Sequence, residues 1–156
     1  MNTFHWLKGK TWGLSILTAA LTLSATASAA LPDSAELKQR ELADGLYEMV
    51  YSPTANALYV ASAQSFKNVN GGVLYKLDPT TLATQGETHT DLKNFGMAAD
   101  DNGKVYYTTN TLDGGVSKVD VQSGKVLQRL MFEGKDKDGD PVGAREILFH
   151  KGQLFI

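Results

Sequence analysis

The sequence of 156 residues contains no cysteine at all. This absence excludes disulfide bonds and cysteine-ligated metal centres, so packing alone must stabilise the fold. Only three histidines are present, and His89 and His150 stand apart in separate segments. Because zinc sites need several such ligands close together, and no cysteine or second histidine lies near either one, we predict no metal site and no bound cofactor.

The first 32 residues contain no acidic side chain. Instead Lys8 and Lys10 precede an apolar stretch over residues 11–27, and Ala27-Ser28-Ala29 supplies the small residues of a cleavage site. This pattern is typical of a secretory signal peptide, and we expect cleavage after Ala29, with Ala30 as the alternative. A membrane anchor is disfavoured because the stretch is shorter than the ~20 residues that a span needs.

Cleavage also changes the charge of the chain. Removing residues 1–29 leaves 13 basic residues against 17 acidic ones, a net charge of −4. A mildly acidic exported chain without disulfides suits a bacterial periplasm, with no membrane attachment after cleavage. The same charge disfavours a broad basic surface for nucleic acid.

From Gly45 onward, short apolar runs alternate with turn residues, which predicts β-strands. Two successive groups of four such runs can be aligned, and a third group begins near residue 145. The register is regular, because Tyr59, Tyr107 and Phe155 are each 48 residues apart. A four-stranded unit that recurs about every 40–50 residues is typical of a β-propeller blade. The predicted strands are 46–52, 57–63, 72–78, 82–90, 95–100, 104–110, 115–121, 125–132, 145–150 and 153–156.

The best-defined repeat reads Tyr107-Thr108-Thr109-Asn110, followed by Val116-Ser117-Lys118-Val119-Asp120 and Gly124-Lys125-Val126. It resembles the YVTN-repeat family of β-propellers, although Thr108 replaces the family's valine. The upstream copy begins at Tyr59 and lacks the final asparagine. The segments GLYEMVYS and GGVLYKLDPTTL resemble the periplasmic YncE-like branch of that family. The resemblance implies a seven-bladed propeller.

We therefore predict an all-β fold: a partial seven-bladed β-propeller of about two and a half four-stranded antiparallel blades. The signal peptide (1–29) is followed by a polar leader (30–44) and an incomplete propeller domain (45–156). Its blades are expected at 45–93, 94–143 and a truncated 144–156.

A partial ring leaves sheet faces uncovered, and arrays of this kind depend on contacts between neighbours. We therefore expect the N-terminal fragment of a longer propeller, with a ring assembled from several copies as the alternative. Residues 36–42 of the leader are a possible closure strand for the last blade.

The acidic loop Asp136–Asp140 alternates acids as a calcium loop does. Pro141 and Ile147 stand where such a loop needs glycine and glutamate, so we expect a solvated connection between blades. The glycine pairs at 71–72 and 114–115 are not followed by the Gly-Lys-Ser/Thr of a phosphate loop. No catalytic residue is predicted.

The segments that lead into the first strand of each blade, and the loops that join its second strand to its third, share one face of a propeller. The entering segments lie nearest its central channel. Aromatic, acidic and basic side chains recur there and could hold a small polar ligand. The alternative is that the aromatic residues fill the core between blades while the charged ones form a structural cluster. The candidate ligand-binding residues are Tyr47, Glu48, Phe95, Gly96, Asn110, Arg145 and Glu146.

These features predict a non-catalytic ligand-binding or protein-interaction scaffold in the periplasm. One alternative, which the resemblance implies, is single-stranded DNA binding, with aromatic side chains for bases and lysines for phosphates. Another is the propeller subunit of a redox enzyme, although no nucleophile–base pair or cofactor motif is present. The net charge disfavours the nucleic-acid alternative. Its candidate residues are Phe66, Lys67, Tyr75, Lys76, Lys93, Phe95 and Lys118.

Overall fold

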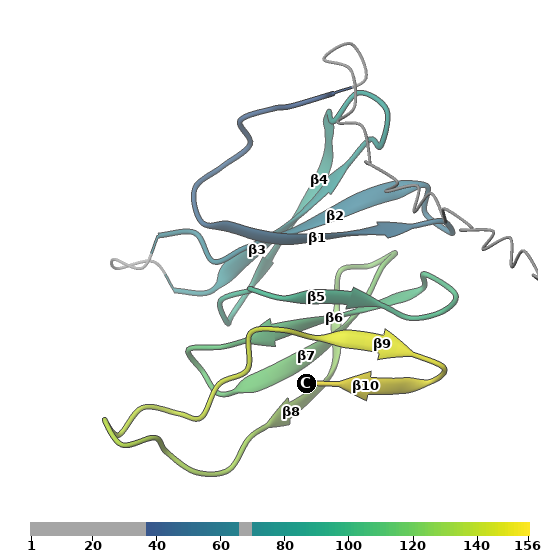
Figure 1. Cartoon of the computed structure of the whole chain (residues 1–156). Coiled ribbons are helices and arrows are strands. Elements are labelled where there is room, and N and C mark those ends of the chain that lie inside the picture. Colours follow the sequence, from purple (N-terminus) through teal and green to yellow (C-terminus); the bar gives the residue numbers. More distant parts are fainter. Residues whose placement is uncertain (1–36, 66–69) are drawn as a thin grey trace, which may run out of the picture.

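The computed structural model describes residues 37–65 and 70–156, and within these residues it contains strands and no helix (Figure 1). Two four-stranded antiparallel sheets have the orders β1-β2-β3-β4 and β5-β6-β7-β8, and β9 pairs with β10 in a hairpin. The strands are β1 Leu46–Ser52, β2 Ala57–Ser62, β3 Gly72–Leu77, β4 Thr84–Thr90, β5 Met97–Ala99, β6 Val105–Asn110, β7 Gly115–Asp120, β8 Val126–Met131, β9 Leu148–His150 and β10 Gln153–Phe155.

Aspartates close the turns between strands and so fix the strand register. Asp100 Oδ1 accepts hydrogen bonds from the backbone N–H groups of Lys104 and Val105 at 2.8 and 2.9 Å. Asp120 Oδ1 accepts hydrogen bonds from the backbone N–H and the hydroxyl of Ser123 at 2.7 and 2.6 Å. These hydrogen bonds lower the pKa of the Asp120 carboxyl, which stays ionised. Asp100 and Asp120 are therefore both turn formers.

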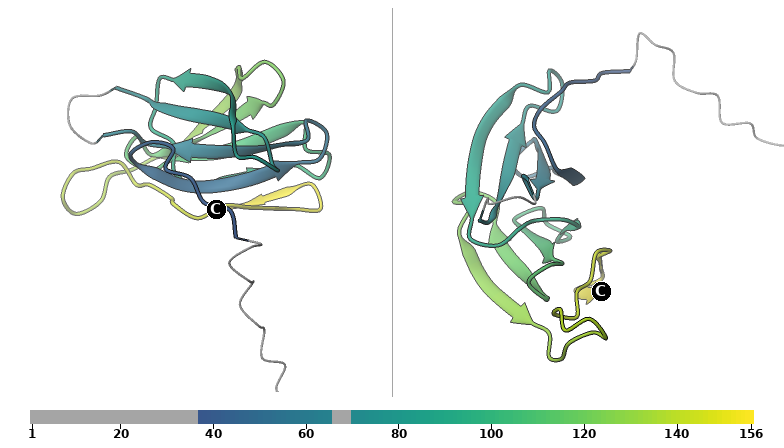
Figure 2. Two further views of the ribbon diagram at one scale, coloured as in Figure 1. Left: turned by 90° about the horizontal axis from the view of Figure 1, so that it is seen from above. Right: turned by 90° about the vertical axis from the view of Figure 1, so that its left-hand side faces the viewer.

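The two sheets follow one another along an arc, as the right-hand view of Figure 2 shows. β1 contacts β5, and β5 contacts β9, so the first strand of every unit lies on the same inner side. Buried apolar side chains fill the space between the sheets, where the rings of Tyr59 and Tyr106 lie 5.2 Å apart. Burial raises the pKa of both tyrosines, which stay neutral.

The predicted all-β architecture of four-stranded antiparallel units is confirmed. β4 begins at Thr84 rather than at Leu82, because Leu82 lies in a turn with a φ of 59°. β5 covers only Met97–Ala99 of the expected 95–100. Just before it, the Gly96 N–H donates to the Thr109 side chain on β6 instead of to a backbone carbonyl, so the regular ladder is interrupted. β9 begins at Leu148 instead of residue 145.

Two predictions concern the N-terminal part of the chain. The signal peptide, residues 1–29, lies outside the described residues. Residues 37–43 carry no regular strand, although Lys38 Nζ and Arg40 Nη1 donate to the backbone carbonyls of Thr80 and Leu82. The described residues include no helix that is long and apolar enough to cross a membrane.

Candidate functional site

One cavity of about 340 Å³ is lined by six of the seven predicted site residues. They come from the equivalent place in three successive units, where the chain enters the inner strands β1, β5 and β9. The adjacent inner strands bring these segments together although they are about 50 residues apart in sequence. The lining residues are Tyr47, Glu48, Phe95, Gly96, Arg145 and Glu146.

The threonine Thr109 on β6 holds two of these segments together. Its hydroxyl accepts a hydrogen bond from the Gly96 N–H at 2.8 Å and donates one to the Arg145 carbonyl at 3.0 Å. A Cβ atom on Gly96 would lie 2.0 Å from that same carbonyl oxygen, so only glycine fits. Thr109 was read from the sequence only as a repeat residue, and its role as a bridge depends on the third unit.

The guanidinium of Arg145 lies over the aromatic wall of the cavity. Its guanidinium carbon lies 4.8 Å from the centre of the Tyr47 ring and 5.8 Å from that of Phe95. The two rings meet edge to face, 4.6 Å apart, and Phe95 is buried whereas Tyr47 is 37% exposed. Within the described residues the Arg145 guanidinium makes no ion pair, so its N–H groups remain available. A contact of this kind orients a guanidinium and weakens its hydration.

The two acids of the cavity differ in their surroundings. Glu48 Oε2 accepts a hydrogen bond from the Met97 N–H at 2.8 Å, so this carboxylate fixes the start of β5. Glu146 is exposed and has no hydrogen bond or ion pair among the described residues. The cavity therefore offers one cation and one uncommitted anion side by side.

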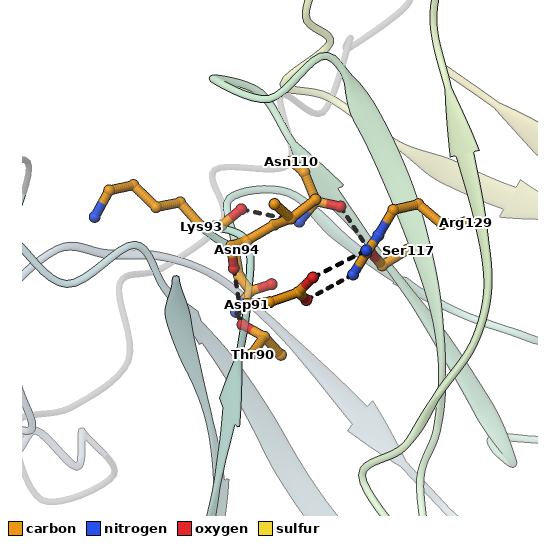
Figure 3. Close-up of polar contacts among 8 residues, drawn as sticks. Thr90, Asp91, Lys93, Asn94, Asn110, Ser117 and Arg129 are labelled. Atoms are coloured by element: carbon orange, nitrogen blue, oxygen red, sulfur yellow. Dashed lines mark hydrogen bonds and ion pairs between the residues drawn. The ribbon is translucent and has the colours of Figure 1, made fainter. Parts of the chain in front are cut away.

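Asn110, the seventh predicted residue, does not line this cavity. It is buried at the end of β6, where its amide donates to the Lys93 carbonyl at 2.9 Å. Its Oδ1 accepts a hydrogen bond from the Ser117 hydroxyl at 2.7 Å. Figure 3 shows Asn110 inside a network of polar contacts rather than at an open surface.

That network contains an ion pair that the sequence analysis missed. Arg129 on β8 binds both carboxylate oxygens of Asp91, at 3.0 and 2.7 Å, and its Nε donates to Ser117 at 3.1 Å (Figure 3). These hydrogen bonds lower the pKa of Asp91. Asp91 follows the first sheet and Arg129 belongs to the second, so the pair connects two blades. No sequence signal relates two residues 38 positions apart.

Two of the residues offered for nucleic-acid binding are already engaged. Phe95 is buried, and the ammonium of Lys93 donates to the carbonyls of Ala63 and Ser65 at 2.8 and 2.7 Å. Phe66 and Lys67 lie outside the described residues.

No group of three or more metal-ligating side chains occurs in the described part of the chain, where His89 lies on β4 and His150 on β9. In the acidic loop, Asp136 Oδ1 accepts hydrogen bonds from the backbone N–H groups of Asp138 and Asp140 at 2.8 and 3.0 Å. This carboxylate stabilises a local turn.

No family model matches the chain. The chain is 31% identical over 150 residues to the YncE protein of Escherichia coli strain K12, a match that covers 95% of this chain and 42% of that protein. It is 35% identical over 115 residues to YncE of Escherichia coli O157:H7, covering 72% of this chain and 33% of that protein. The chain thus spans less than half the length of these relatives. Both relatives are uncharacterised proteins, so the similarity indicates no particular activity.

Solved structures with a similar backbone have low sequence identity to this chain. The WD40 repeats of RRP9 match 79% of this chain and 36% of their own, with a TM-score of 0.55 and 16% identity. Hydrazine synthase from Kuenenia stuttgartiensis matches 78% of this chain and 30% of its own, with a TM-score of 0.54 and 16% identity. At this identity the similarity shows the fold alone.

The four-stranded antiparallel units, stacked with their first strands on one side, define the chain as part of a β-propeller. Its sequence relatives make it a YncE-like β-propeller.

Proposed function

We propose that the chain belongs to an exported, non-catalytic scaffold that binds a small polar ligand in the cavity between β1, β5 and β9. The observation that supports this function is the Arg145 guanidinium, which lies over the Tyr47 and Phe95 rings and has no ion pair among the described residues. An aromatic wall with a few convergent polar groups is the usual composition of a ligand site.

The arrangement favours a ligand with a planar anionic group and a nearby donor. The guanidinium lies over the Tyr47 ring and has no ion pair among the described residues, so it can bind a carboxylate through two parallel hydrogen bonds. Glu146 is free to accept from an ammonium or hydroxyl group. At about 340 Å³ the cavity suits a molecule of amino-acid size.

Calorimetric titration of the full chain with glycine, L-glutamate and succinate tests this function. Arg145→Gln is expected to weaken all three at least tenfold, because each carboxylate loses its partner. Arg145→Lys should restore only part of the affinity, since an ammonium neither stacks flat nor binds through two parallel bonds. Glu146→Gln should weaken the two amino acids and leave succinate unchanged.

The exposed Glu133, which lies outside the cavity, serves as the control. Glu133→Gln should leave all three affinities unchanged. The fold of the titrated chain is checked by circular dichroism. If the folded chain gives no heat of binding with any of the three probes at millimolar concentration, the proposal is contradicted.

We also propose that the protein works in the periplasm after cleavage behind Ala29. Both tryptophans, Trp6 and Trp12, lie in the segment that would be removed. Cleaved protein should therefore fractionate with the periplasm and show tyrosine but no tryptophan fluorescence. Tryptophan emission from the mature protein would contradict this processing.

A further inference from the structure

A second cavity, of about 530 Å³, lies where the turns of two successive blades meet. It takes residues from the β1–β2 turn and from β2 and β3 of the first sheet. From the second sheet it takes residues of the β5–β6 and β7–β8 turns. These turns lie at the opposite strand ends from the segments that enter β1, β5 and β9, so the cavity is separate from the one discussed above. Its lining residues are Thr54, Ala55, Tyr59, Lys76, Lys104, Asp120, Val121 and Gln122.

Hydrogen bonds between the blades brace the walls of this cavity. The Ser52 hydroxyl donates to the Gly103 carbonyl at 2.6 Å, and the Thr54 hydroxyl donates to the Asn102 carbonyl. The Tyr59 hydroxyl donates to the Val121 carbonyl at 3.1 Å. The cavity is thus formed by turns whose relative position is fixed before any ligand binds.

Two lysines line the cavity, one from each blade. Lys76 on β3 is the direct cross-strand neighbour of Tyr59, and Lys104 precedes β6. Neither ammonium makes a hydrogen bond or an ion pair within the described ranges. On the other side of Lys76 the strand partner is Gly86, and nothing lies within 4 Å of where its Cβ would be. The β4 position directly opposite Lys76 therefore carries no side chain.

The balance of charge around the cavity is positive. Asp120 is the one acid among the lining residues, against two lysines. Its Oδ1 already accepts two hydrogen bonds from Ser123. The hydroxyls of Thr54 and Tyr59 are engaged with carbonyls, so the uncommitted donors are the two ammonium groups and the Gln122 amide.

We propose that this junction cavity binds a phosphate group, free or as a phosphate monoester. An ammonium is a compact point charge that pairs with phosphate oxygens from many directions, and lysines serve in phosphate sites in this way. A phosphate dianion offsets both lysines and accepts from the Gln122 amide. The ligand bridges Lys76 of one blade and Lys104 of the next, so it also stabilises the junction.

The test is titration of the full ¹⁵N-labelled chain with inorganic phosphate and with glycerol 3-phosphate, at constant ionic strength. Amide shifts are expected around residues 54–55, 76, 104 and 120–122. Lys76→Gln and Lys104→Gln should each weaken binding at least tenfold, because each leaves one cation against a dianion. Lys76→Arg keeps the charge and should retain binding. Tighter binding of glycerol 3-phosphate would assign the site to phosphate esters, and equal binding to the free ion.

Lys118 provides a matched control, because it is the cross-strand neighbour of Tyr107 as Lys76 is of Tyr59. It faces a cavity with no second lysine. Lys118→Gln removes the same charge and should leave phosphate binding unchanged. Equal weakening by Lys118→Gln, or amide shifts scattered over the surface, would overturn the proposal. So would the absence of shifts with either phosphate probe.

Discussion

At the scale of single residues, two glycines have opposite surroundings: Gly96 lies in close contact with a neighbouring segment, whereas Gly86 borders open space. A Cβ on Gly96 would meet the Arg145 carbonyl oxygen at 2.0 Å. Gly86, in the middle of β4, has nothing within 4 Å of the same atom. The first glycine holds the candidate ligand site together, whereas the second is a strand position that tolerates a side chain.

Gly96→Ala is therefore expected to lower the free energy of unfolding by about 1–3 kcal/mol, as overpacking at a rigid contact does. It should also weaken ligand binding, because Arg145 must move. Gly86→Ala should be neutral or slightly stabilising, since glycine is unfavourable within a strand. Urea unfolding of both variants measures the difference. Equal effects from the two substitutions would show that the close contact at Gly96 is not maintained in solution.

Arg145 shows where sequence reasoning succeeds and where it stops. Its place in the repeat predicted that it would share a face with Tyr47 and Phe95, and the structure brings the three together. The position of its guanidinium over the Tyr47 ring and the bridge from Thr109 depend on side-chain geometry, which a repeat register does not contain. Asn110 was predicted on the same face, at the end of β6, yet it turns inward to bond Lys93 and Ser117.

At the scale of elements, polar contacts tie one blade to the next. The Asp91–Arg129 pair joins the end of β4 to β8, and its hydrogen bonds depress the pKa of Asp91. The pair is partly exposed to solvent, so its contribution to stability is modest. A carboxyl with a depressed folded-state pKa stabilises the fold above its unfolded pKa, about 3.9, and loses that effect as the pH falls through the folded value.

Asp91→Asn is therefore expected to reduce stability at pH 7 by up to about 1 kcal/mol. The difference from wild type should shrink as the pH falls below about 4, where the wild-type carboxyl becomes protonated as well. Thermal unfolding between pH 2.5 and pH 7 measures this. Asp101→Asn, at an exposed turn residue without such a partner, is the control. A difference that persists undiminished at pH 2.5 would mean that the ion pair does not cause it.

Apolar runs bounded by turn residues predicted the strands well, although β2 is almost entirely buried and β8 is mostly exposed. The exceptions lie at strand starts, where backbone geometry overrides the pattern. Leu82 was predicted as the first residue of its strand, but its positive φ places it in the turn before β4. Phe95 and Gly96 read as strand residues, but they form an irregular junction that the side chain of Thr109 closes. Such side-chain closures lie outside any periodic pattern.

The leader remains a predicted closure strand, and its position is informative. Lys38 and Arg40 donate to carbonyls in the β3–β4 turn of the first blade. One blade further along, β4 lies against the corresponding β7–β8 turn, where Gly124 approaches Thr88. Residues 37–43 therefore contact the first blade at the place where β4 contacts the second blade.

At the scale of the whole molecule, apolar side chains are exposed at both ends of the arc. Met49 on β1 is 63% exposed at one end, while Leu148 and Phe155 of the last hairpin are 61% and 51% exposed at the other. Within the arc the equivalent surfaces are covered by the neighbouring blade, as Tyr59 and Tyr106 show. Uncovered apolar sheet faces favour association, either with further blades or with another copy of the chain.

The 156-residue chain by itself is therefore expected to self-associate, with a sedimentation coefficient that rises with concentration. Replacing Leu148 and Phe155 together with lysine should lower this association, because it charges one of the two open ends. Thr84→Lys, an exposed substitution on the outer strand β4, should leave it unchanged. A broad distribution of sizes fits a blade array that lacks its neighbours. A single discrete oligomer would instead support a ring assembled from copies, and a monomer at every concentration would contradict both.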